Sequence, residues 1–313
     1  MGWAGDLTEV KNCLVTAQIY EEVINDTRHI IINAPKDSGN DCVSNCYYVY
    51  PYGNATPKGA KPVTMEQIES GEVCYRLNLN EDEYGWPTHR TTFRQNIGED
   101  KYPVYDVMHG LVEEIPLTGY AGWSPGLFNE ELGEPNNRLN VQLPQGVKAY
   151  AGTIRGKTLV LHPVDILNRS QGYVLKGNPG YYSMMPTNEQ STNVKNNLDG
   201  SKTNFMSGGG CYILDAKDGV VGFYEVPYGD RIENHTAYMH DTGVWVDMFP
   251  LCFDGDVNGD GTVDISDYIG VANHILGNTP DGFNADAADV NGDGAIDISD
   301  YIGVANIILT GKP

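Results

Sequence analysis

Short runs of hydrophobic residues, separated by polar turn formers, occupy the central part of the chain. They recur about every 8–12 residues between Gly, Asn, Asp and Pro, which is the spacing of strands in an all-β domain. The runs are Lys148–Ile154, Thr158–Pro163, Gly172–Lys176, Gly180–Met184, Gly210–Leu214, Gly219–Val226 and Thr236–His240. Residues 138–250 are therefore expected to form a β-sandwich, since about 110 residues suffice for one core.

The hydrophobic positions take a helical spacing near the C-terminus. Two stretches repeat apolar residues at intervals of three and four, which predicts two amphipathic helices. Gly277 and Pro280 are placed to end the first helix. We expect a small all-α module over residues 251–313. Its apolar positions are Tyr268, Ile269, Val271, Ala272, Ile275 and Leu276, and then Tyr301, Ile302, Val304, Ala305, Ile307, Ile308 and Leu309.

Each predicted helix follows a loop of one sequence pattern. Residues 256–277 read DVNGDGTVDISDYIGVANHILG and residues 289–310 read DVNGDGAIDISDYIGVANIILT. Ca²⁺ prefers oxygen ligands, which a twelve-residue loop supplies from positions 1, 3, 5, 7, 9 and 12, with a sharp turn at position 6. Gly261 and Gly294 fill position 6. Two Ca²⁺ ions are therefore expected, held by Asp256, Asn258, Asp260, Thr262 (backbone carbonyl), Asp264 and Asp267, and by Asp289, Asn291, Asp293, Ala295 (backbone carbonyl), Asp297 and Asp300.

The loops depart from a standard EF-hand, which has a helix on both sides and Glu at position 12. Residues 249–255 (FPLCFDG) are no helix, and position 12 is Asp in both copies. A calcium loop with a single exiting helix, used twice, resembles the type I dockerin family over about residues 252–313. The resemblance implies a module of two pseudo-symmetric loop-helix units.

The resemblance also implies a partner, the cohesin domain of a scaffoldin or cell-surface protein. Dockerins commonly recruit polysaccharide-degrading enzymes to cellulosome-like complexes, and near-identical copies would let either helix face the cohesin. The family often carries Lys or Arg along the helix, whereas this chain has none there, so a self-contained calcium cap stays open. The positions that match the family's partner contacts are Ile265, Ser266, Asn273, His274, Ile298, Ser299, Asn306 and Ile307.

Composition narrows the classes of partner and the compartment. The net charge is −22, and eleven acidic residues but no Lys or Arg lie between Asp254 and Asp300. Such a surface repels nucleic acid phosphates. No apolar run approaches the ~20 residues that span a bilayer. We expect an extracellular or cell-surface location, because calcium is abundant there. Since residues 1–3 open no signal peptide, we expect this chain to be the C-terminal piece of a longer protein.

The N-terminal region carries a faint repeat. Val10–Val15 (VKNCLV) is echoed by Val43–Val49 (VSNCYYV), and Arg28–Ala34 between them is a strand candidate. With Gly2-Trp3-Ala4-Gly5 upstream, residues 1–52 resemble the end of a GLUG-type repeat array, which implies a β-solenoid.

Residues 53–137 are expected to form a linker and junction segment. Within it, Val63–Glu72 predicts a short helix, because Thr64 and Gln67 fit a capping box. Gly122–Gly126 (GWSPG) fits the nucleophile motif G-x-S-x-G by letter only, since Pro125 has no N–H for an oxyanion hole. The cysteines allow free thiols or one or two disulfides; they are Cys13, Cys42, Cys46, Cys74, Cys211 and Cys252.

Three classes of function remain open. The first is a non-catalytic, calcium-dependent docking protein. The second is a glycoside hydrolase whose active domain lies upstream or within residues 53–250, although no catalytic residue can be assigned. The third is a carbohydrate-binding adhesin in which the calcium unit is a cap. Trp86, Trp123 and Trp245 could then stack on a glycan, or they could pack in the core and turns.

Overall fold

The computed structural model divides the chain into two compact units, which are described separately. Residues 1–114 with 181–185 form the first unit, and residues 115–180 with 186–313 form the second. The structure describes residues 10–16, 43–49, 60–81, 87–89, 92–125, 140–190, 194–240 and 242–310. Trp86 and the predicted strand at 28–34 lie outside these ranges.

Parallel strands stack at the start of the first unit. Strand β1 (Val10–Lys11) pairs with β3 (Val43–Ser44), and β2 (Leu14–Val15) pairs with β4 (Cys46–Val49), which pairs with β5 (Ala60–Val63). The two echoed segments therefore lie in register. Asn45 Nδ2 donates to Asn12 Oδ1 at 2.8 Å, so the repeated Asn side chains bridge neighbouring strands.

Two helices follow where one was predicted. Helix α1 (Met65–Glu69) begins at the predicted capping box, where Thr64 and Gln67 each accept the other's backbone N–H. Gly71 has φ of +89°, which ends α1 and leads into the unpredicted helix α2 (Glu72–Asn78). Strands β6 (Leu79–Glu81), β7 (Pro87–His89) and β8 (Leu111–Ile115) come next. The buried core of this unit contains Tyr47, Val63, Ile68, Val73, Cys74, Leu77, Phe93 and Val112.

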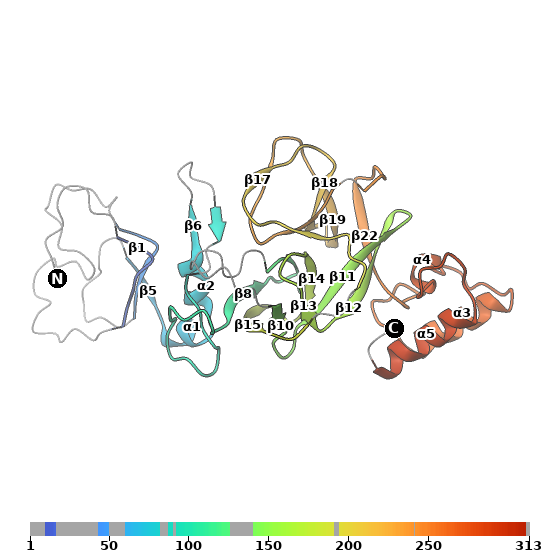
Figure 1. Ribbon diagram of the computed structural model, residues 1–313, viewed down its shortest axis with the longest axis horizontal. Helices are drawn as coiled ribbons and strands as arrows, with labels where there is room; N and C mark the ends of the chain where they lie inside the picture. The colour runs from blue at the N-terminus through green and yellow to red at the C-terminus, as the bar shows by residue number, and fades with distance from the viewer. Residues whose placement is uncertain are drawn as a thin grey trace, which may run out of the picture. The chain divides into compact units, whose positions relative to one another are not determined.

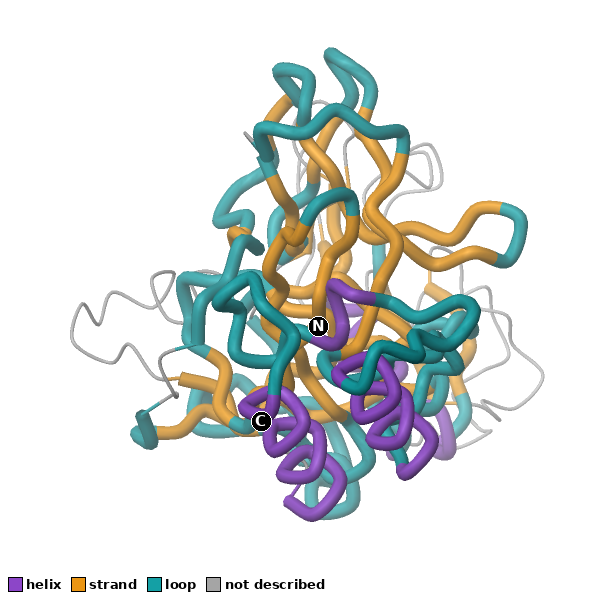
Figure 2. The backbone as a smooth tube through the Cα atoms, turned by 90° about the vertical axis from the view of Figure 1, so that its right-hand side faces the viewer, coloured by secondary structure: helices purple, strands orange, loops and turns teal. Residues whose placement is uncertain are grey.

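Strands are the main secondary structure of the chain, which confirms the prediction of a mainly β protein (Figure 2); all the strands that follow β8 lie in the second unit except most of β15, which lies in the first. Each of the seven strands predicted between residues 148 and 240 is present, with ends shifted by a few residues. The strands that follow β8 are β9 (Tyr120–Trp123), β10 (Asn140–Gln142), β11 (Lys148–Arg155), β12 (Thr158–Val164), β13 (Ile166–Leu167), β14 (Tyr173–Lys176), β15 (Gly180–Thr187), β16 (Asp199–Gly200), β17 (Phe205–Met206), β18 (Cys211–Lys217), β19 (Val220–Val226), β20 (Arg231–Ile232), β21 (Ala237–Met239) and β22 (Met248–Phe253).

The main sheet nearly closes on itself, whereas the sequence predicted two facing sheets. Its nine strands follow the order β16-β21-β18-β19-β22-β12-β11-β14-β9, and a bridge joins Trp123 of β9, at one end, to Thr236, which precedes β21 near the other end. Strand β22 pairs in parallel with β12 and antiparallel with β19, so it joins two hairpins into one sheet. The sequence prediction did not assign β22 as a strand. The enclosed core contains Tyr150, Leu159, Leu161, Val174, Leu198, Tyr212, Phe223, Met239 and Phe249.

Three helices follow the sheet at the C-terminal end (Figure 1). They are α3 (Ile265–Ile275), α4 (Ala285–Ala288) and α5 (Ile298–Thr310). Helices α3 and α5 pack together, and the rings of Tyr268 and Tyr301 stack between them at 3.9 Å. Gly277, with φ of +85°, follows the end of α3 as predicted. Within the described part of the chain, none of the helices is long and apolar enough to cross a membrane.

Candidate functional site

The first predicted calcium loop is folded around the carboxylate of Asp256. Its two oxygens accept the backbone N–H groups of Asp260 at 3.1 Å and Gly261 at 2.9 Å. The Asp260 carboxylate in turn accepts the N–H of Thr262 at 2.9 Å. Gly261 has φ of +86°, a conformation that glycine adopts without strain. The sharp turn predicted at position 6 is therefore present.

Asp267 closes the same loop from the first turn of α3. One oxygen accepts the N–H groups of Val257 at 2.8 Å and Asn258 at 3.1 Å, and the other accepts that of Asp264 at 2.9 Å. Asp264 is the N-cap of α3 and accepts the N–H of Ser266 at 2.7 Å. The Asp at position 12 thus belongs to a capping box as well as to the loop.

The second loop repeats this arrangement 33 residues further on. Asp289 accepts the N–H groups of Asp293 at 3.1 Å and Gly294 at 3.0 Å. Asp300 accepts those of Asn291 at 3.1 Å and Asp297 at 2.9 Å. The two copies therefore present the same oxygen atoms in the same order.

Burial makes the ionised form of two carboxylates of the first loop costly. It raises the pKa of Asp256, and the nearby charge of Asp267 adds to the rise. Burial likewise raises the pKa of Asp267. Neighbouring buried carboxylates that disfavour ionisation fit a divalent cation, whose charge would offset both effects. The all-oxygen donor set fits Ca²⁺.

The carboxylates of the loops are directed at backbone donors rather than at one another. Across the residues that the structure describes, no three His, Cys, Asp or Glu side chains converge to hold a metal ion. A calcium loop also uses Asn side chains and a backbone carbonyl, here from Asn258 and Thr262 in the first copy. Metal binding would exchange some of the N–H contacts for metal contacts.

A glycine in each helix allows the helix to pack on its own loop. A Cβ at Gly270 would lie 2.8 Å from Val257 Cγ2, and a Cβ at Gly303 would lie 2.8 Å from Val290 Cγ1. Neither glycine was predicted from the sequence to have a role. The available signal was a glycine at the same helical position in both copies, where it costs about 1 kcal/mol relative to Ala. The core that they complete contains Cys252, Val257, Val271, Ala287, Ala288, Val290 and Val304.

Apolar side chains also cover the outer surface of α3 and α5. Ile265 and Ile298 are 61% and 60% exposed, and Leu276 and Leu309 are 76% and 80% exposed. Ile269 and Ile302 are exposed as well, because Val271 and Val304 fill the inner side. We call these six residues the helix surface: Ile265, Ile269, Leu276, Ile298, Ile302 and Leu309.

The predicted partner positions divide into two groups. Ile265, Ser266, Ile298, Ser299 and Asn306 are exposed, and Asn273 is half-buried. In contrast, His274 stacks on Phe283 at 4.6 Å and its Nδ1 lies 3.0 Å from Thr279 Oγ1. Ile307 packs against the core of the loop-helix module. The structure therefore brings loop positions 10 and 11 to the surface and leaves His274 and Ile307 half-buried in contacts within the module.

Comparison with known proteins identifies this part of the chain. No curated protein and no solved structure matches the chain. The family model of the Dockerin type I domain matches residues 254–309, which span both loops and most of α5. Dockerin domains bind calcium, and a dockerin indicates calcium-dependent docking to a cohesin. The chain carries a type I dockerin domain at its C-terminal end.

Proposed function

We propose that the dockerin binds two Ca²⁺ ions, one in each loop, and then docks to a cohesin domain through the helix surface. The equivalence of the two loops supports calcium binding, because the same carboxylate oxygens accept the same backbone N–H groups in each loop. The ligands are those predicted from the sequence, namely Asp256, Asn258, Asp260, Thr262, Asp264 and Asp267, and Asp289, Asn291, Asp293, Ala295, Asp297 and Asp300.

The helix surface supports the second part. Exposed apolar patches mark sites of protein contact, and these side chains occur as equivalent pairs on α3 and α5. No Lys or Arg lies between residues 254 and 300, so the partner surface has to be apolar at its centre and neutral or basic at its rim. We propose a cohesin of a scaffoldin or cell-surface protein, outside the cell, in a polysaccharide-degrading assembly.

Cohesin binding of the full chain tests this function. We expect a panel of type I cohesin domains to include one that binds in calcium and not in EDTA. Ile265→Asp combined with Ile298→Asp should weaken that binding at least about a hundredfold, since apolar anchors dominate interfaces. Leu117→Asp is the matched control, because Leu117 is 93% exposed outside the dockerin. Equal binding by both variants would contradict the assignment of the helix surface.

The domain division predicted from the sequence stands as part of this proposal, with one refinement. Strand β22 continues to Phe253, which supports a start of the dockerin at Asp254. The in-register parallel strands at Val10–Val15 and Val43–Val49 support a solenoid end over residues 1–52. Cys13, Cys74, Cys211 and Cys252 are free thiols.

We propose carbohydrate binding as a second function, at a pair of exposed aromatic rings. Trp123 is buried, whereas Trp245 is 78% and Tyr228 is 84% exposed. Val244 and Val246 pack against the sheet core, so Trp245 between them points outward. Aromatic rings offer a flat apolar face on which the C–H face of a pyranose can stack.

The two rings flank one glycine turn. A Cβ at Gly210 would lie 3.5 Å from Trp245, and a Cβ at Gly209 would lie 3.8 Å from Tyr228. The turn that carries Tyr228 is fixed by a bond from Gly229 N to Ser207 O at 2.9 Å. This geometry fits a short neutral glycan, because a chain of net charge −22 repels polyanions.

A glycan array tests the second function. Trp245→Ala and Tyr228→Ala should each abolish binding to a neutral glycan, while Tyr105→Ala, an exposed tyrosine of the other unit, should not. If no neutral glycan binds, or if Trp245→Ala binds as the parent does, the aromatic pair has no such role.

A further inference from the structure

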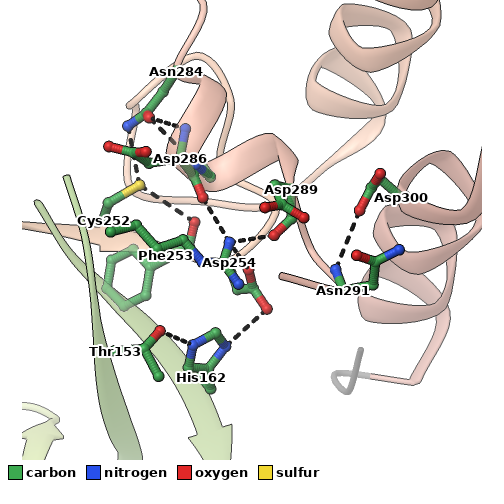
Figure 3. A network of polar contacts seen from close by, with 12 residues as sticks. Thr153, His162, Cys252, Phe253, Asp254, Asn284, Asp286, Asp289, Asn291 and Asp300 are labelled. Carbon is green, nitrogen blue, oxygen red and sulfur yellow. Dashed lines mark hydrogen bonds and ion pairs between the residues drawn. The ribbon is translucent and has the colours of Figure 1, made fainter. Parts of the chain in front are cut away.

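One face of the main sheet meets the dockerin across β11, β12 and the C-terminal end of β22. Thr153 pairs with Val160 and Val160 pairs with Cys252, so these residues point to one side of the sheet. Residues two positions further along a strand share that side. Arg155, His162 and Asp254 therefore lie on the same face as Thr153. Figure 3 shows His162 between Thr153 and Asp254 beside the dockerin loops.

Asp254 is the centre of this face. Its side chain is 1% exposed, Oδ2 lies 2.9 Å from His162 Nδ1, and Oδ1 lies 3.5 Å from Arg155 Nη1. Burial raises the pKa of Asp254, and His162 and Arg155 lower it. The imidazole of His162 links two side chains: Nδ1 lies 2.9 Å from the Asp254 carboxylate, and Nε2 lies 2.6 Å from the Thr153 hydroxyl.

The order hydroxyl, imidazole and carboxylate resembles a catalytic triad, but the surroundings differ. Thr153 is 6% exposed in the middle of β11, so a substrate carbonyl could not reach its hydroxyl. These contacts instead hold the polypeptide in place two residues before Asp256, the first residue of the first loop.

Arg155 reaches from this face to the second loop. Its Nη1 donates to the carbonyl oxygen of Asp286 at 2.7 Å and to that of Asp289. These carbonyls lie at the end of α4, where a cation is favoured, and Asp289 is the first residue of the second loop. A Cβ at Gly292, three residues into that loop, would lie 3.4 Å from Arg155 Nη2. The guanidinium therefore lies directly against the second loop, whereas on the side of the first loop its ion pair is with Asp254, two residues before that loop begins.

We propose that Arg155, a residue of the β-sheet, is a positioning residue for the second calcium loop. By fixing the carbonyl of Asp289 it fixes the backbone from which the first ligand of that loop extends. The inference rests on the proposed calcium function and adds to it that the sheet is part of the metal-binding unit. Groups that orient metal ligands from outside typically contribute about 10–100-fold in metal affinity.

The guanidinium also carries a charge that repels a cation, so contact and charge have opposite effects on affinity. Arg155→Ala removes both, Arg155→Lys keeps the charge and loses the paired donors, and Lys157→Ala removes one charge from the exposed turn nearby. If contact dominates, the two Arg155 variants weaken calcium binding about tenfold or more. Lys157→Ala leaves the affinity unchanged or slightly higher.

Calcium titration of the full chain tests this assignment. With Asp256→Ala present only the second loop binds, and there Arg155→Ala should weaken binding about tenfold. With Asp289→Ala present only the first loop binds, and Arg155→Ala should change its affinity less than about twofold. Hydrogen exchange of otherwise unchanged chains gives an independent result: Arg155→Ala should speed exchange in residues 286–297 and not in 256–264.

Two results would overturn the role of Arg155 alone: unchanged affinity of the second loop, or equal weakening of both loops together with equal changes in exchange. Failure of the parent chain to bind calcium at either loop would overturn the proposed calcium function, and this inference with it.

Discussion

Different interactions stabilise the sheet and the dockerin of the second unit. The sheet encloses large side chains such as Tyr212, Phe223 and Phe249, each of which contributes about 1.5–3 kcal/mol when buried. The dockerin core consists mostly of Val and Ala, and two carboxylates, Asp267 and Asp300, have no exposed surface. Apolar burial suffices for the sheet, whereas we expect the dockerin to need a cation that offsets the charge of its buried carboxylates.

Calcium removal should produce the largest difference between the two regions. At a thousandfold excess over the dissociation constant, each bound ion stabilises its loop by about 4 kcal/mol. We expect the dockerin to unfold in EDTA while the sheet persists. The near-ultraviolet circular dichroism of stacked Tyr268 and Tyr301 should be lost, and hydrogen exchange should rise only beyond residue 253.

Asp256→Ala with Asp289→Ala should reproduce the effect of EDTA in calcium buffer, because both loops lose their first ligand. Asp218→Ala, in an exposed turn of the sheet, is the matched control and should keep the response to calcium. Equal protection of the dockerin from hydrogen exchange in calcium and in EDTA would show that metal does not stabilise this module.

A cavity in the core of the sheet should destabilise the sheet, and calcium should not change the effect. Phe223 is fully buried, and truncation of such a residue costs about 3–5 kcal/mol. Phe223→Ala should lower the stability of the sheet by that amount in calcium and in EDTA alike, as measured by urea unfolding. If the loss depended strongly on calcium, the sheet and the dockerin would share one source of stability.

The glycines of α3 and α5 should show a smaller effect within the dockerin. Gly303→Ala places a Cβ against Val290, an overpacking that costs about 1–3 kcal/mol and outweighs the gain of about 1 kcal/mol in helix propensity. Asn306→Ala, on the exposed side of α5, should show the propensity gain alone. Thermal unfolding in calcium measures both, and a stabilised Gly303→Ala would refute this packing.

Most of the features that the sequence predicted depend on local sequence patterns. The loop turns at Gly261 and Gly294, the cap at Thr64 and the strand runs of the sheet depend on neighbours in the chain, so they were accessible. The long-range features were not. Two examples are the parallel pairing of β22 with β12 and the hydrogen bond from Arg155 to the Asp289 carbonyl. Each joins residues about a hundred positions apart, which no local sequence pattern predicts.

The hydrophobic periodicity of α3 and α5 likewise did not distinguish buried from exposed residues. Apolar residues cover more than one side of each helix, so Ile269 could not be separated from Val271 before the packing was known. Exposure of Trp245 and burial of Trp123 had the same cause, since both lie in short runs of similar composition.

The smallest predicted effect is a pH dependence of the dockerin that changes sign with calcium. The pKa values of Asp254, Asp256 and Asp267 are raised, mainly by burial. Without metal, their contribution is present below the unfolded pKa of about 3.9 and is lost as pH rises through the folded values. Asp260 has a lowered pKa and contributes in the opposite sense, but it is exposed.

In calcium-free buffer, lowering the pH from about 7 to about 4 should therefore restore part of the tyrosine signal of the dockerin. In calcium the same change should weaken the dockerin, because the ligands must be ionised to bind metal. Asp267→Asn removes one of the titrating groups and should reduce both slopes. Parallel slopes in the two buffers would mean that these carboxylates do not face a metal ion, and the contrast between an apolar sheet and an ion-dependent dockerin would then lose its electrostatic basis.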